Sequence, residues 1–197
     1  MRRNPALVAG LLMAVMAAAP RAQEVDVAAL LAEARERYLA GERTAVLDRL
    51  REATAALRRE LADLLVTRLP AEIAGLRGGP AETDLPEIPT AGLGIVVRRT
   101  YTGDGMSVTV ELYRDAPFVG AVAGAFAGPV LAMAPGTRRT RIGPHEMVWF
   151  WKPEERRAEG LLTVGTTVLM VRGTGVDGPD RFETVLGALA DLLAPLP

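Results

Sequence analysis

The apolar residues of this chain change their spacing once along the sequence. Up to Pro70 they recur every three or four positions, the period of a helix face, and from Ile95 they recur every second position, the period of a strand. A chain that places its helical pattern before its strands does not build alternating helix–strand units. We therefore predict an α+β fold: an antiparallel sheet of about six strands with helices on one face, preceded by an N-terminal helical hairpin.

Residues 23–74 carry the helical pattern. Two apolar runs are separated by Ala40 and Gly41, and the second run ends at Pro70. The first run comprises Val27, Leu30, Leu31, Ala34, Tyr38 and Leu39, and the second comprises Val46, Leu47, Leu50, Ala53, Leu57, Leu61, Leu64 and Leu65. We expect the two arms to pack on each other and on the rest of the chain. Plain core is the main interpretation of these stripes, and a surface for a partner is the alternative.

A stretch rich in proline, glycine and acidic residues marks the predicted domain boundary. Residues 75–93 contain Gly78-Gly79-Pro80 and are interpreted as a linker or an extended strap. Residues 94–197 form the predicted α+β domain. Its strands are expected near 95–101, 106–112, 138–142, 145–151, 160–164 and 167–174. A final helix begins at Asp177 or Asp180, either of which can cap it.

Residues 1–22 have the three-part layout of a secretory signal peptide. Arg2 and Arg3 give a positive start, residues 6–19 are apolar, and Pro20-Arg21-Ala22 ends the run. The apolar run is too short to span a bilayer. We expect cleavage near Ala22 and a periplasmic or secreted location in a bacterium. Because the chain has no cysteine, we expect the exported protein to form no disulfide and to carry no lipid-anchored cysteine.

The charge balance and the residue inventory exclude several functions. Removing the three leader arginines takes the 23 basic residues to 20, against 24 acidic ones, and a mildly acidic protein has no electrostatic attraction for nucleic acid. His145, Ser107 and Lys152 are the only residues of their types, and cysteine is absent. With so few nucleophiles and metal ligands, we expect no catalytic residues, no metal and no cofactor.

Residues 116–137 contain no charged side chain. Gly120, Gly124 and Gly128 stand four positions apart, as in membrane helices that pack closely. Membrane insertion is one interpretation, but Pro129 and Pro135 would interrupt a spanning helix. The interpretation that we favour is a close-packed helix at 117–127 followed by a short turn at 129–134, with no membrane contact.

The strand predicted at 145–151 is apolar on both faces and supplies the first candidate binding site. His145, Met147, Trp149 and Trp151 share one face of it. A strand of this kind is covered on both sides, and the second cover is the N-terminal hairpin, a partner or a ligand. The four side chains are therefore candidates to line an apolar ligand groove. The alternative is that they belong to the core or lie beneath the hairpin.

Three arginines form a second candidate site. Arg138, Arg139 and Arg141 carry guanidinium groups, which can hold a carboxylate or phosphate in a fork. Charged residues on an edge strand also protect a sheet from aggregation. Protection of the edge is the alternative interpretation of the three.

The order of elements resembles a set of small exported proteobacterial proteins to which no activity is attached. The resemblance rests on Tyr38-Leu39-Ala40-Gly41, Arg99-Thr100-Tyr101-Thr102 with Gly103-Asp104, Val108-Thr109-Val110, Asp115-Ala116-Pro117 and residues 171–177. It spans most of the mature chain. It implies the same architecture and names no function.

The export signal and the sparse catalytic inventory together suggest a non-catalytic function. We expect a periplasmic binding or protein-interaction module whose ligand is an unknown protein or a small apolar molecule. One alternative is a hydrolase that uses His145 with carboxylates in a tryptophan-lined cleft. The other alternative is a membrane-associated protein that attaches through residues 116–137.

Overall fold

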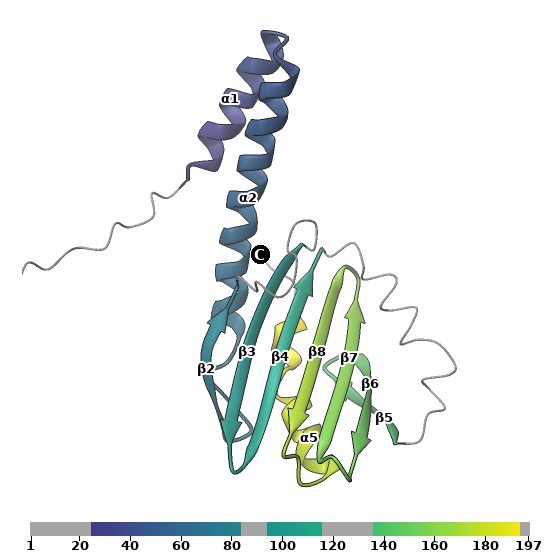
Figure 1. Ribbon diagram of the computed structural model, residues 1–197. Coiled ribbons are helices and arrows are strands. Elements are labelled where there is room, and N and C mark those ends of the chain that lie inside the picture. Colours follow the sequence, from purple (N-terminus) through teal and green to yellow (C-terminus); the bar gives the residue numbers. More distant parts are fainter. Residues whose placement is uncertain (1–24, 84–93, 116–135, 194–197) are drawn as a thin grey trace, which may run out of the picture.

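The computed structural model describes residues 25–83, 94–115 and 136–193, leaving aside the side chains of Asp191 and Leu193. The predicted leader, the helix expected at 117–127 and the turn expected at 129–134 lie outside these residues. Figure 1 shows the described part as one antiparallel sheet with helices. None of the helices in these ranges is long and apolar enough to cross a membrane.

The sheet is antiparallel throughout, which confirms the predicted α+β class. It holds eight strands in the order β1-β2-β3-β4-β8-β7-β6-β5, so the prediction of about six was wrong. The strands are β1 (Glu72–Ile73), β2 (Leu76–Glu82), β3 (Ile95–Gly103), β4 (Met106–Arg114), β5 (Thr137–Ile142), β6 (His145–Lys152), β7 (Arg157–Val164) and β8 (Thr167–Thr174). Strands that are consecutive in sequence pair with each other, except β4 and β5. β4 pairs with β8 instead, which leaves β5 at the far edge of the sheet.

Of the two strands that the prediction lacked, β1 lies at the end of the segment predicted as the helical hairpin, and β2 lies in the segment interpreted as a linker. Residues 72–82 form β1 and β2, and β2 pairs with β3. The pairing register shifts between Gly78 and Ala81, around Pro80. Proline is tolerated there because β1 is only two residues long, which leaves most of β2 at the edge of the sheet. A glycine- and proline-rich sequence can therefore still form an edge strand.

The alternation of side chains divides the sheet into two unlike faces. Val97, Val108, Val110 and Val171 are fully buried in the main hydrophobic core, together with residues of the helices. Their sequence neighbours point to the opposite face. The turn between β3 and β4 has Asp104 and Gly105 at positive φ, as the predicted hairpin requires.

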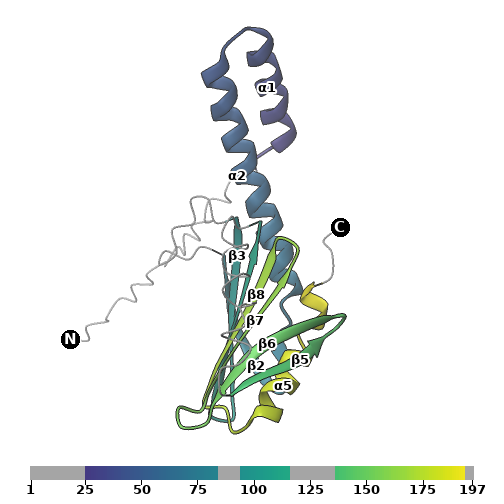
Figure 2. The same ribbon diagram turned by 90° about the vertical axis from the view of Figure 1, so that its right-hand side faces the viewer.

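A C-terminal helix fills the concave side of the sheet. Helix α5 (Pro179–Gly187) lies behind the sheet in Figure 1, and Figure 2 shows β5 and β6 curling toward it. Phe182 of α5 packs on Trp149, with ring centroids 5.2 Å apart. Gly173 leaves room for this helix, because a Cβ there would lie 3.0 Å from the Phe182 ring. The short helix η1 (Ala190–Leu193) follows α5 and contacts α2.

The start of α5 differs from the predicted capping. The N-cap residue is Gly178, and no side chain bonds to the first turn. Asp177 instead forms an ion pair with Arg156. Asp180 lies within the first turn, where its negative charge favours the helix dipole.

The N-terminal helices form a hairpin that extends beyond the sheet (Figures 1 and 2). Helix α1 (Val27–Leu39) is capped by Asp26, whose carboxylate accepts a hydrogen bond from the Ala29 N–H. It packs along α2 (Arg43–Arg68). Only the last turns of α2 reach the core, through Ala62 and Leu65. The greater part of the hairpin is therefore not covered by the sheet.

Arg99 of β3 attaches the end of α2 to the sheet. Its guanidinium donates hydrogen bonds to the Leu69 carbonyl at 2.7 Å, to the Pro70 carbonyl at 3.2 Å and to the Gly79 carbonyl at 2.8 Å. Two of these carbonyls lie just past the last residue of α2, where backbone acceptors lack helical partners. This arginine fixes the direction in which the hairpin leaves the sheet.

Candidate functional site

The face of β6 predicted to bind a ligand is packed against the C-terminal helix. Met147 and Trp149 are fully buried, and the Trp149 ring lies against Phe182. His145 and Trp151, at the two ends of the strand, are partly buried. Helix α5 occupies the concave side of the sheet and packs against the middle of this face, where Trp149 lies. Their burial agrees with the alternative interpretation as core, and a role in ligand binding stays a prediction.

The hydrolase alternative requires a carboxylate beside His145. His145 pairs with Ile142 at the start of β6, next to the turn between β5 and β6. The ion pairs among the described residues do not include His145, and Glu146 contacts Arg139 at 3.5 Å. The same part of the chain holds no group of three or more His, Cys, Asp or Glu residues that could bind a metal ion. The acid–base pair of that alternative is thus not formed by the described residues.

The three arginines of β5 do not converge. Arg138 pairs across the sheet with Trp149, and its guanidinium lies 5.8 Å from the centre of that ring. Arg139 and Arg141 point to the opposite face, because successive residues of a strand alternate. A single fork made of all three side chains is therefore excluded by the strand geometry, and the arginines lie on an edge strand as the alternative interpretation expected.

A buried carboxylate lies on the face of the sheet opposite α5. Glu111 of β4 is 1 % exposed and bridges two arginines. Its Oε1 is 2.8 Å from Arg98 Nε, and its Oε2 is 2.6 Å from Arg172 Nη2. The Tyr113 hydroxyl donates a hydrogen bond to Oε2 at 3.0 Å. The cluster joins β3, β4 and β8 at the middle of the sheet.

The environment of this cluster keeps the Tyr113 phenol neutral. Burial and the adjacent Glu111 carboxylate raise the pKa of Tyr113 to about 12, although Arg172 and Arg98 oppose the shift. The phenol therefore remains a hydrogen-bond donor to the carboxylate at any physiological pH. We interpret the cluster as a structural clamp across three strands, because its carboxylate is already satisfied by three donors.

Helix α2 presents a stripe of exposed leucines, which we call the leucine stripe: Leu47, Leu50, Leu57 and Leu64. Their exposed fractions range from 41 to 53 %. The four positions follow the spacing of a heptad pattern, with Thr54 and Leu61 in the intervening places. A shallow groove on α2 is lined by Leu47, Leu50, Arg51, Thr54, Ala55 and Arg58. Exposed leucines in a row, on a helix that leaves the sheet, indicate a surface for another molecule.

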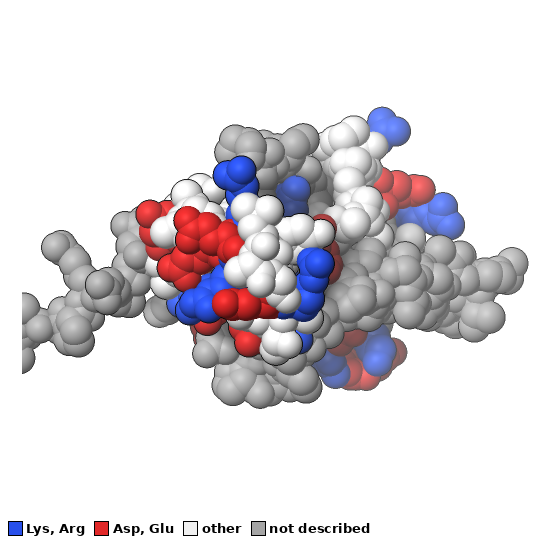
Figure 3. Space-filling model, turned by 90° about the horizontal axis from the view of Figure 1, so that it is seen from above, with Lys and Arg blue, Asp and Glu red and all other residues white. Residues whose placement is uncertain are grey.

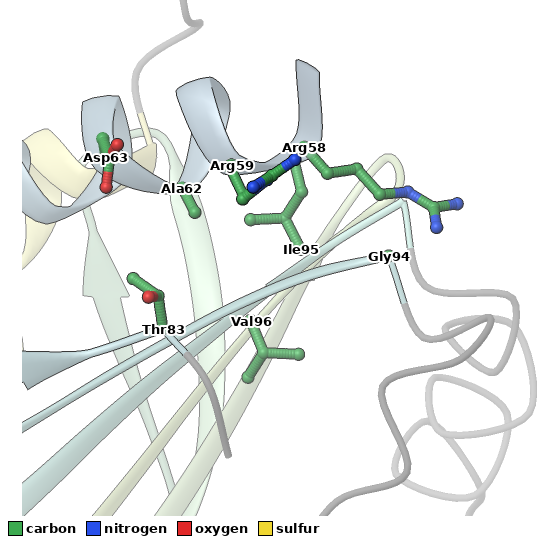
Figure 4. A pocket seen from close by; sticks show the side chains of 8 residues that line it. All are labelled: Arg58, Arg59, Ala62, Asp63, Thr83, Gly94, Ile95 and Val96. Atoms are coloured by element: carbon green, nitrogen blue, oxygen red, sulfur yellow. The ribbon is translucent and has the colours of Figure 1, made fainter. Parts of the chain in front are cut away.

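A second hollow lies at the base of the hairpin, between α2 and the beginning of β3 (Figure 4). Its cavity volume is about 380 Å³, and its lining residues are Arg58, Arg59, Ala62, Asp63, Thr83, Gly94, Ile95 and Val96. We call it the base pocket. Arg58 also lines the groove beside the leucine stripe, so the two hollows adjoin each other along α2.

Figure 3 shows the charge distribution on the hairpin as seen from above. Uncharged side chains form a continuous area that is bordered by both basic and acidic side chains. Several charged residues along the hairpin pair with each other: Arg49 contacts Glu33 and Glu52, and Arg51 contacts Asp48. Among the described residues, no ion pair involves Arg58 or Arg59.

Sequence reasoning missed the exposed state of the leucine stripe and did not single out Arg58, Arg59 or Glu111. The leucines were predicted mainly as core. A usable signal was the adjacent pair Arg58-Arg59, which lies between Leu57 and Leu61 of the apolar stripe. For Glu111, the usable signal was its place within the predicted strand 106–112, next in the chain to the predicted strand 95–101 that carries Arg98.

The chain has no match among protein-family models, curated proteins or solved structures. Its resemblance to the exported proteobacterial set therefore stays a prediction, and so does its export. Function is inferred below from the residues of this chain alone.

Proposed function

We propose that this protein is an exported, non-catalytic protein-interaction module, and that the leucine stripe of α2 binds an amphipathic helix of a partner protein. The observation that carries the proposal is the exposure of Leu47, Leu50, Leu57 and Leu64 on a helix that extends beyond the sheet. Proteins that act alone rarely leave a row of apolar side chains open to water.

The spacing of the stripe favours a helical partner. The two core positions of a heptad repeat fall at residues 47, 50, 54, 57, 61 and 64. A partner helix fits such a stripe by inserting its own side chains between those of the stripe. Covering the exposed half of one leucine contributes roughly 1 kcal/mol. Four leucines together supply a binding energy that suits a specific but reversible complex.

The arginines beside the stripe favour an acidic partner over a second copy of this chain. Arg51 follows core position 50, and Arg58 follows core position 57, so both arginines lie at the border of the heptad seam. In an antiparallel pair of α2 helices, Arg51 of one copy would face Arg58 of the other, and like charges there oppose association. A helix with glutamates along its borders would pair with Arg58, which forms no ion pair among the described residues, and would compete with Asp48 for Arg51.

Model peptides test this proposal directly. We expect the mature protein to bind a labelled amphipathic helix with leucine at its core positions and glutamate at its borders, and to bind the lysine-bordered version at least tenfold more weakly. Leu50→Glu and Leu57→Glu should each weaken binding of the glutamate peptide at least tenfold, measured by fluorescence anisotropy. Leu31→Glu, which changes an equally exposed leucine of α1, is the matched control.

Two results of that experiment would overturn the proposal. One is that the protein binds the two peptides equally well, or that the Leu50→Glu and Leu31→Glu proteins bind the glutamate peptide equally well. The other is a dimer in sedimentation that dissociates in Leu50→Glu, because it would make a second copy the occupant of the stripe. Circular dichroism of each variant shows that a loss of binding is not a loss of folding.

Export is supported by Arg2, Arg3, the apolar run 6–19 and the small residue Ala22. We expect the full chain, expressed in a Gram-negative bacterium, to accumulate in the periplasmic fraction with its N-terminus near residue 23. Replacing Arg2 and Arg3 by glutamate should retain an uncleaved product inside the cell. Recovery of the unaltered chain from carbonate-washed membranes would instead favour attachment through residues 116–137.

A further inference from the structure

We propose that the base pocket binds a small amphiphilic anion: one short apolar chain with a carboxylate or phosphate head. This site adjoins the groove beside the leucine stripe and shares Arg58 with it, but it accepts a different class of molecule. The proposal rests on the shape of the cavity, its apolar floor and the two arginines that line it.

The floor of the base pocket is formed by apolar side chains that the fold holds in place. Ala62 of α2 and Ile95 of β3 are both buried, and Figure 4 shows the Ile95 side chain directed toward the helix. Gly94 forms part of the wall at a φ of 77°. A Cβ at Gly94 would lie 2.0 Å from the Arg114 carbonyl, so glycine is required at this point of the wall.

Two arginines of α2 contribute to the lining of the cavity. Arg58 and Arg59 are adjacent in α2, and both line the pocket. Within the described ranges, neither forms an ion pair with a carboxylate, unlike Arg49 and Arg51 on the same helix. Arg59 uses Nε to donate to the Ala55 carbonyl at 3.3 Å, which leaves its two terminal nitrogens for a ligand.

The charge balance of the pocket selects an anion. Among the lining residues that the structure describes, Asp63 is the single acidic one, against the two arginines. An arginine fork matches a carboxylate or phosphate head in geometry as well as in charge. The cavity volume of about 380 Å³ lies at the small end of ligand sites, which suits one short chain better than a large molecule.

Titration with three eight-carbon probes tests the proposal on the mature protein. We expect octanoate or octyl phosphate to bind saturably, and octylammonium to show no saturable binding, by isothermal titration calorimetry. The tighter of the two anions identifies the head group. Arg59→Gln should weaken anion binding at least fivefold, while Arg35→Gln, which changes an exposed arginine of α1, should leave it unchanged.

A second variant tests the location of the site. Thr83 is exposed at the edge of the base pocket, so Thr83→Trp is expected to fold and to block the cavity. Equal anion binding by Thr83→Trp and the unaltered protein, or no saturation with either anion, would overturn the proposal. Because Arg59 and Thr83 do not line the groove beside the leucine stripe, peptide binding should survive both changes. Failure of one proposal can thus be distinguished from failure of the other.

Discussion

Replacing Glu111 by glutamine is expected to lower the free energy of unfolding by about 3 kcal/mol. The carboxylate is 1 % exposed and accepts from Arg98, Arg172 and Tyr113. Glutamine keeps the size of the side chain but removes the charge that both guanidinium groups face. It also places two N–H donors where three donors already converge, so that at least one contact becomes unfavourable.

Urea unfolding followed by circular dichroism measures this change, and Glu146→Gln is its matched control. Glu146 forms an exposed contact with Arg139 on the edge strand, and such pairs contribute about 0 to 1 kcal/mol. The unfolding midpoint of Glu146→Gln should therefore stay close to that of the unaltered protein. If Glu111→Gln were no more destabilising than Glu146→Gln, the interpretation of the cluster as a clamp across β3, β4 and β8 would be wrong.

Six of the eight strands were predictable, and the clearest signal was the period of two in β3 and β4. Val108 and Val110 alternate with Ser107 and Thr109, and this local pattern alone places them on opposite faces. The partner of a polar residue has no such local signal. Glu111 is bonded to Arg172, which is 61 positions away in sequence. The alternation of residues around Glu111 therefore did not predict that its side chain is buried.

The hairpin shows a different limit of sequence reasoning. An apolar stripe indicates which side of a helix is covered, but it does not indicate how far the covering surface extends. Leu65 and Leu50 belong to one predicted stripe, yet Leu65 is buried in the main core whereas Leu50 is exposed. The length of α2 relative to the sheet, which depends on the three-dimensional fold, separates core from exposed surface.

β6 illustrates the converse case. Its two apolar faces predicted a cover on both sides of the strand, but any of several elements could have supplied each cover. The cover of the Trp149 face is α5, whose Phe182 contacts the indole ring. Helix α5 was itself predicted, but its position across the concave side follows from the curl of β5 and β6, for which the sequence carries no local signal.

Trp149→Ala is expected to lower the free energy of unfolding by about 3 to 5 kcal/mol, because it empties the centre of the core. Trp149 is fully buried and contacts Phe182 of α5. Trp149→Phe should cost clearly less, because it retains an aromatic ring and removes the indole Nε1–H, which is buried without a partner among the described residues.

Urea unfolding followed by far-ultraviolet circular dichroism measures both variants without relying on the fluorescence of the replaced tryptophan. Trp151→Ala is the comparison, since Trp151 is on the same face but only partly buried, and its loss should be smaller than that of Trp149→Ala. A Trp149→Ala protein as stable as the unaltered one would contradict the packing of α5 on this face. It would return the face of His145, Met147, Trp149 and Trp151 to consideration as an open ligand site, because a side chain that binds a ligand contributes little to the stability of the free protein.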